Sequence, residues 1–157
     1  AFLSKHQTTR TLLLNHTIIM RQINLLVIHS SATKENQSFT LQALETSHRK
    51  RGFNGIGYHY YIRQSGEVIN TRPLSQTGVH VKGYNRYSIG ICYEGGLDSV
   101  GNPADTRTPE QKEALLKLLK RLKKDYPDAQ ILGHRDLPNV AKECPCFEVK
   151  AEYINLN

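Results

Sequence analysis

The sequence predicts a single α/β domain in which a mixed central β-sheet of about five to six strands is flanked by helices. Two observations lead to this fold class: short apolar runs rich in β-branched residues alternate with segments of helical periodicity, and two of the runs form a hairpin pattern. The length of 157 residues suits one globular domain whose core needs no disulfide. With 38% hydrophobic and 22% charged residues, the composition excludes disordered, collagen-like and membrane-spanning classes.

The first half of the chain is expected to contain a strand, a helix and a hairpin. Residues 23–29 (INLLVIH) form a continuous apolar run, which is typical of a buried central strand. Apolar residues at helical spacing predict a helix over 41–51, which Gly52 ends. The runs at 57–62 and 67–71 are joined by a Gly-containing turn and predict a hairpin.

The second half repeats the alternation of strand and helix. Residues 88–93 (SIGICY) predict another buried strand. A capping box and a proline at the first helical position predict a helix over 109–126 with one apolar face. A short strand over 129–132 and a terminal helix over 148–154 complete the expected elements.

Three polar stretches predict loops, at residues 30–36, 72–87 and 95–105. A loop as long as 72–87 is uncommon inside a compact domain and is often functional.

The N-terminal residues 1–22 are expected to be an extension, and residues 23–157 the domain. The extension carries basic residues and no acidic ones, but it lacks an apolar segment that ends in a signal-peptide cleavage site. The only methionine is Met20, so we expect the core to start near it. No stretch of the chain reaches the ~18 apolar residues of a membrane-spanning helix.

The net charge indicates which kinds of partner the surface attracts, and the cysteines indicate whether the chain contains disulfides. The formal net charge is +7, so the surface attracts anions, whether nucleic acid, anionic lipid or a substrate with carboxylates. Cys92, Cys144 and Cys146 are an odd number, and only Pro145 separates the last two. That spacing is too short for an unstrained bridge, so we expect no disulfide framework.

Two histidines and one cysteine form a candidate metal site. His29 and His134 each follow an apolar strand and precede a polar loop, where an open α/β sheet usually presents its site. Cys144 lies ten residues after His134. Two imidazoles and a thiolate make a three-ligand zinc site with an open fourth position, the arrangement of catalytic zinc. Spacing alone leaves open that these histidines are hydrogen-bonding surface groups.

Several ordered strings carry a resemblance to a known family. They are VIHSSAT at 27–33, GYHY at 57–60, HVKGYN at 80–85, SIGIC at 88–92, TPEQ at 108–111, and GHRD with AKECPCF at 133–147. Their joint order and spacing resemble the zinc-dependent N-acetylmuramoyl-L-alanine amidases of the phage-lysozyme and peptidoglycan recognition protein superfamily (amidase type 2). The resemblance runs from about Ile23 to Tyr153, nearly the whole chain after the extension.

The resemblance implies that His29, His134 and Cys144 bind one Zn²⁺ per chain. It also implies the reaction, which is hydrolysis of the amide between N-acetylmuramic acid and L-alanine in peptidoglycan. Zinc held by such a set lowers the pKa of its water toward ~7 and polarises a carbonyl.

In the phage-type branch of that family, the positions of Tyr58 and Lys142 support catalysis. Lys142, as a cation, is expected to hydrogen-bond the tetrahedral oxyanion, and Tyr58 to act as a donor rather than as a base. Other branches place a Glu where this chain has Cys92, and we do not transfer that role to Glu94. The general base therefore stays open.

Further residues near the expected site are assigned from the resemblance or from position. Four residues of the long loop are expected to contact substrate: His80, Lys82, Tyr84 and Asn85. In a regular strand, Tyr58 and His59 face opposite ways. Arg135 and Asp136 flank His134 and are expected to pair beside it.

The expected partner is peptidoglycan or a muropeptide, with no nucleic acid and no membrane insertion, and the enzyme is expected to be a monomer. Carboxylates of the stem peptide suit a basic groove. Lysis, remodelling and recycling of the wall all use this chemistry. We expect synthesis in a bacterial or phage-infected cytoplasm, without a signal peptide, and action on the cell wall.

Two alternatives belong to other functional classes. A non-catalytic peptidoglycan recognition module would lack the ligand Cys, which this chain has. A basic nucleic-acid- or protein-binding domain would use the lysine-rich face of the 109–126 helix, but Glu110, Glu113 and Asp125 interrupt that face.

Overall fold

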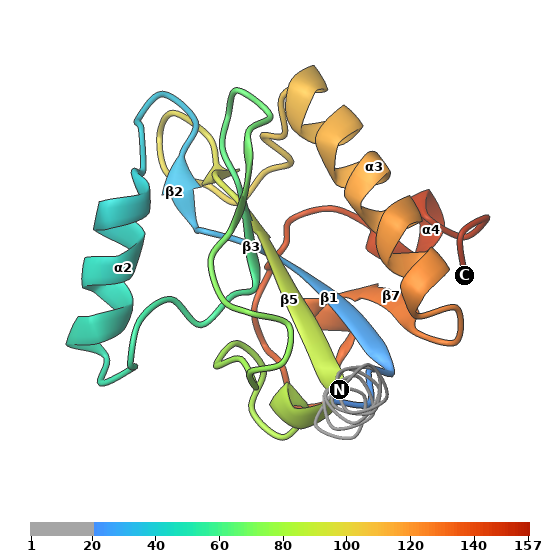
Figure 1. Cartoon of the computed structure of the whole chain (residues 1–157). Helices are drawn as coiled ribbons and strands as arrows, with labels where there is room; N and C mark the ends of the chain where they lie inside the picture. The colour runs from blue at the N-terminus through green and yellow to red at the C-terminus, as the bar shows by residue number, and fades with distance from the viewer. Residues whose placement is uncertain (1–20) are drawn as a thin grey trace, which may run out of the picture.

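The structure is a computed structural model that describes residues 21–157. The expected start of the core near Met20 and nearly all of the expected extension lie outside these residues. The described part is one α/β unit with a central five-stranded sheet, as the sequence predicts (Figure 1).

The strand order of the sheet is β4-β3-β5-β1-β7. The strands are β1 (Leu25–Ser30), β3 (Tyr60–Ile62), β4 (Val68–Asn70), β5 (Ser88–Tyr93) and β7 (Gln130–Gly133). All neighbours pair in parallel except the edge strand β4, which forms the predicted hairpin with β3. The central strands β1 and β5 are buried on both faces, which explains their continuous apolar sequences.

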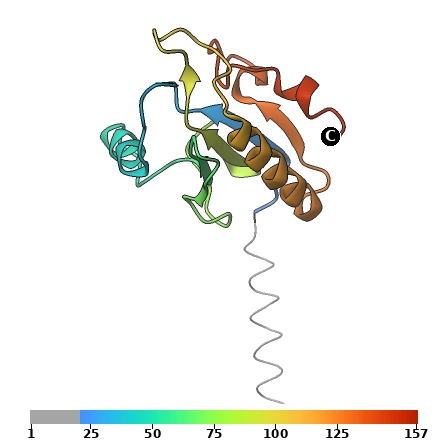
Figure 2. The same cartoon turned by 90° about the horizontal axis from the view of Figure 1, so that it is seen from above.

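Helices cover both faces of this sheet. Helix α2 (Leu41–Lys50) lies on one side, and helices α3 (Pro109–Asp125) and α4 (Val149–Glu152) lie on the other (Figures 1 and 2). The predicted capping box of α3 is present, with the Thr108 hydroxyl and the Gln111 side chain bonded to each other's backbone amides. None of the helices in residues 21–157 combines the length and the hydropathy that a membrane crossing requires.

The alternation of side chains along β1 separates the core from the site. Leu26 and Ile28 point into the main apolar cluster beneath α3 and α4. Val27 packs in a different cluster, with Leu132 of β7 and Val81 of the long loop. Because successive residues of a strand face opposite ways, His29 faces the same side as Val27, away from α3.

The long loop over 72–87 crosses this second face and contains no strand. Arg72 and Arg21 stabilise the loop, because their guanidinium groups donate to backbone carbonyls. Arg21 bonds the carbonyls of Leu74, Asn85 and Ser88, so this last part of the expected extension contacts the domain.

Two short elements differ from the sequence expectation. Strands β2 (Thr33–Lys34) and β6 (Gly96–Leu97) pair in parallel where loops were predicted. Strands of two residues show no periodicity, so no pattern could indicate them. Strand β3 begins at Tyr60 rather than at residue 57, and the Gly57 carbonyl accepts from the Val79 N–H of the long loop at 3.0 Å.

Candidate functional site

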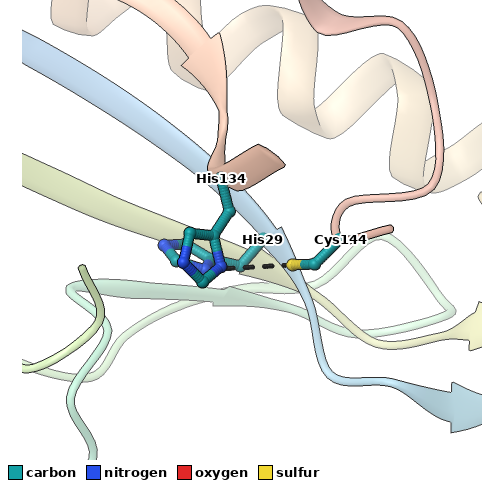
Figure 3. A group of neighbouring side chains, drawn as sticks. All are labelled: His29, His134 and Cys144. Atoms are coloured by element: carbon teal, nitrogen blue, oxygen red, sulfur yellow. Dashed lines mark hydrogen bonds between the residues drawn. The ribbon is translucent and has the colours of Figure 1, made fainter. Parts of the chain in front are cut away.

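His29, His134 and Cys144 meet at the carboxyl ends of two adjacent parallel strands (Figure 3). His29 lies near the end of β1, and His134 begins the 3-10 turn His134–Asp136 directly after β7. Cys144 comes from the loop that precedes α4. Their ligand atoms all lie within 4.8 Å of one another, and the two imidazole centroids are 4.6 Å apart. The structure thus brings together the three residues that the sequence predicted as metal ligands.

The charge states of these side chains fit a zinc ion. Burial lowers the pKa of His29 well below its ordinary value, and burial together with Lys142 lowers the pKa of His134. Both imidazoles are therefore neutral at neutral pH, as metal ligands must be. Burial raises the pKa of the Cys144 thiol, while the Ser30 amide, which donates to Cys144 Sγ at 3.2 Å, favours the thiolate. A thiolate enclosed in this way is stabilised by a cation.

The 3-10 turn that contains His134 is closed by a hydrogen bond of its own. The Asp136 carboxylate accepts a hydrogen bond from the Gly133 N–H at 2.8 Å. Arg135 points elsewhere and pairs with Glu148 and Glu143. The expected pairing of Arg135 with Asp136 was wrong, because each side chain has a nearer partner.

A cleft of about 510 Å³ opens over the three ligands. Its wall includes Tyr58, Lys142 and the loop residues His80, Lys82 and Asn85. Two larger surface hollows, over α2 and beside α3, contain none of the predicted site residues. Apart from Tyr84, the predicted site residues therefore gather in one place.

Tyr58 lies directly against the candidate metal site. Its ring centroid is 5.0 Å from that of His29, and burial raises its pKa well above 10. The hydroxyl stays protonated, so Tyr58 is suited to donate a hydrogen bond and not to act as a base. His59 does not line the cleft and is fully buried, with Nδ1 accepting from Gly90 N–H.

Where other branches of the family resembled have a Glu, this chain has Cys92. Its thiol is buried next to Tyr58. Glu94, two residues further on, is 1% exposed. Its carboxylate accepts from Phe39 N–H at 2.6 Å, Gln64 N–H at 2.9 Å and the Arg63 Nε at 2.8 Å. Glu94 is thus a structural acceptor that ties three segments together, away from the cleft.

The four predicted substrate residues have different surroundings. Lys82 is exposed at the cleft wall. The ring nitrogens of His80 and the Asn85 Oδ1 are engaged within the protein. Tyr84 packs against the cluster that contains Val27, and it does not line the cleft.

The cleft residues that were not predicted include His48, Arg51 and Phe53. His48 is buried, and its Nδ1 accepts from Gly57 N–H at 2.9 Å. The Arg51 guanidinium lies 4.9 Å from the centroid of the Phe53 ring. These residues reach the site because α2 ends beside it, which depends on how α2 packs and not on a local pattern.

Known proteins resemble this chain in sequence and in fold. The family model described as N-acetylmuramoyl-L-alanine amidase matches residues 20–147. The endolysin of Enterobacteria phage K11 is 40% identical over 123 residues, which cover 78% of this chain and 80% of that protein. The endolysin of Klebsiella phage KP32 is 38% identical over 130 residues, 83% of this chain and 85% of that protein.

A solved structure of an amidase is similar to this chain in both fold and sequence. The N-acetylmuramoyl-L-alanine amidase LysC from Clostridium intestinale URNW superposes with a TM-score of 0.72 at 31% sequence identity. The superposition covers 87% of this chain and 85% of that one. Bumblebee PGRP-SA, at 22% identity and a TM-score of 0.69, shares the fold.

Proposed function

This chain belongs to the N-acetylmuramoyl-L-alanine amidase family, and from that premise we propose that one zinc ion held by His29, His134 and Cys144 serves its reaction. The reaction is hydrolysis of the amide bond between N-acetylmuramic acid and L-alanine in peptidoglycan. The observation that carries the zinc proposal is the convergence of two neutral imidazoles and one thiol within 4.8 Å at one end of the sheet.

Zinc bound by such a donor set supplies a Lewis acid that acidifies water and polarises a carbonyl. The other groups of the cleft serve the charge that develops on the substrate. The protonated Tyr58 hydroxyl is a hydrogen-bond donor beside the ligands, and the Lys142 ammonium places a positive charge at the cleft wall. Both are suited to stabilise the oxyanion that forms when the amide carbonyl becomes tetrahedral.

The cleft also has the charge that a stem peptide requires. Arg51, Lys82 and Lys142 line it, and no acidic side chain does. Free carboxylates of the peptide would lie in a positive field there. We propose that the enzyme acts as a monomer, because the three proposed ligands already meet within one chain.

The biological role follows from the relatives. Endolysins of several phages are 36–40% identical to this chain over more than three quarters of its length. We propose that this enzyme is likewise made in the cytoplasm and acts on the cell wall in lysis.

The test uses two cysteines that lie two positions apart. Cys144→Ser removes a proposed ligand, whereas Cys146→Ser changes a free thiol of the same loop and is the matched control. We expect Cys144→Ser to lose both zinc and hydrolysis, and Cys146→Ser to keep both. Zinc content and activity that survive unchanged in Cys144→Ser would refute the proposed ligand set.

A further inference from the structure

His80 makes a direct hydrogen bond to one of the proposed ligands. Its Nδ1 lies 2.8 Å from His29 Nε2, and its Nε2 lies 3.1 Å from the Ser88 hydroxyl oxygen. The other nitrogen of His29, Nδ1, lies 4.0 Å from Cys144 Sγ. The two nitrogens of His29 therefore face different groups: Nδ1 faces the other ligands and Nε2 faces His80.

The two hydrogen bonds that link His29, His80 and Ser88 are donated in the same direction, from His29 toward Ser88. A neutral imidazole has one donor and one acceptor nitrogen. If Nδ1 of His29 is kept free to bind a cation, the proton is on Nε2, and this N–H donates a hydrogen bond to His80 Nδ1. His80 then carries its own proton on Nε2 and donates to Ser88.

We propose that His80 is a positioning residue that fixes the tautomer and the ring orientation of His29, so that His29 presents Nδ1 to the metal. The inference rests on the zinc site proposed above. Metal-binding histidines commonly donate their second N–H to such a partner, which orients the ring and raises its basicity. This role differs from the substrate contact expected from the sequence, because both ring nitrogens of His80 are already engaged inside the protein.

The surroundings of His80 hold its ring from several sides. A Cβ on Gly90 of β5 would lie 2.7 Å from His80 Cγ, and one on Gly78 would lie 2.8 Å from His80 Cδ2. The ring thus occupies space that only glycine leaves free at both positions. From the backbone side, Asn85 Oδ1 accepts from the N–H groups of His80 and Val81, at 2.9 and 2.8 Å.

Two isosteric substitutions separate the hydrogen bond from the packing. His80→Asn can place an amide oxygen near the position of Nδ1, whereas His80→Leu has the same shape without an acceptor. We expect His80→Leu to weaken zinc binding by about 10- to 100-fold and His80→Asn to retain most of the affinity. Affinity is measured by competition with a chromophoric chelator, and the absorption spectrum of the cobalt-substituted protein reports the ligand geometry.

A purely structural role would lower the melting temperature of both metal-free variants and would not distinguish their zinc affinities. If the wild type binds zinc, and His80→Asn and His80→Leu bind it equally well, the positioning role is wrong and the metal site stands. A wild-type protein that binds no zinc overturns the metal site itself.

Ser88→Ala gives a second test that leaves His80 in place. Ser88 is fully buried, and the substitution removes the acceptor for the His80 Nε2 proton. We expect zinc affinity to fall by about fivefold, the effect of one net hydrogen bond. An unchanged zinc affinity in Ser88→Ala would contradict the proposal that Ser88 fixes the proton of His80 on Nε2.

Discussion

Gly90→Ala is expected to disturb the metal site through the His80 ring. The new Cβ would lie 2.7 Å from His80 Cγ and 2.8 Å from two further ring atoms. The nearest of these distances is about 0.7 Å short of the 3.4 Å at which ordinary contacts begin. The ring cannot shift by that amount without weakening its 2.8 Å bond to His29, because Asn85 holds its backbone.

The magnitude follows from the cost of overpacking a filled site, about 1–3 kcal/mol. In a domain of this size, each kcal/mol lowers Tm by about 2–4 °C. We also expect weaker zinc binding, because the ring of His29 loses its partner. The assays are thermal unfolding of the metal-free protein and zinc affinity by chelator competition.

The control is the same substitution in a His80→Ala background, where the space is free. We expect the cost of Gly90→Ala to shrink there, and the difference is the coupling between the two positions. If Gly90→Ala costs the same stability with and without the imidazole, the clash is not with His80 and the reasoning fails.

Three further predictions test other parts of the site. Because burial raises the pKa of Cys144 while it lowers those of His29 and His134, zinc binding should release one proton, from the thiol. Affinity should then fall about tenfold for each pH unit below the thiol pKa, and a two-proton slope in titrations between pH 6 and 8 would contradict this assignment. Tyr58→Phe should lower kcat by about 10²-fold with zinc content unchanged, since it removes one donor to the oxyanion; an unaltered kcat would remove Tyr58 from the mechanism. Glu94→Gln should lower the free energy of unfolding, measured in urea, by at least about 2 kcal/mol, because the Glu94 carboxylate accepts three hydrogen bonds. Because these bonds lie away from the cleft, kcat per folded molecule should stay the same. Lost activity in the folded variant would reopen a role for Glu94 as the base.

The sequence predicts those features that depend on local patterns. The strand at 88–93 and the capped start of α3 at Pro109 are found as expected, because apolar runs and capping residues act within a few positions. The meeting of His29 and His134 also follows from local signals, since both histidines stand at or near the ends of adjacent parallel strands, whereas the choice of Cys144 came from the family resemblance.

The remaining features depend on packing between distant segments. The hydrogen bond of His80 to His29 joins residues 51 positions apart and requires the path of the whole 72–87 loop. His48 and Arg51 reach the cleft only because α2 packs beside it. The pairing of β2 with β6 has no periodic signal in either strand.

The most direct measurement combines metal analysis of the purified protein with mass spectrometry of digested peptidoglycan. We predict about one zinc per chain, and stem peptides released with a free amino group on L-alanine. Hydrolysis by metal-free protein at the full rate, or products cleaved at a glycosidic or peptide bond instead, would contradict a zinc amidase.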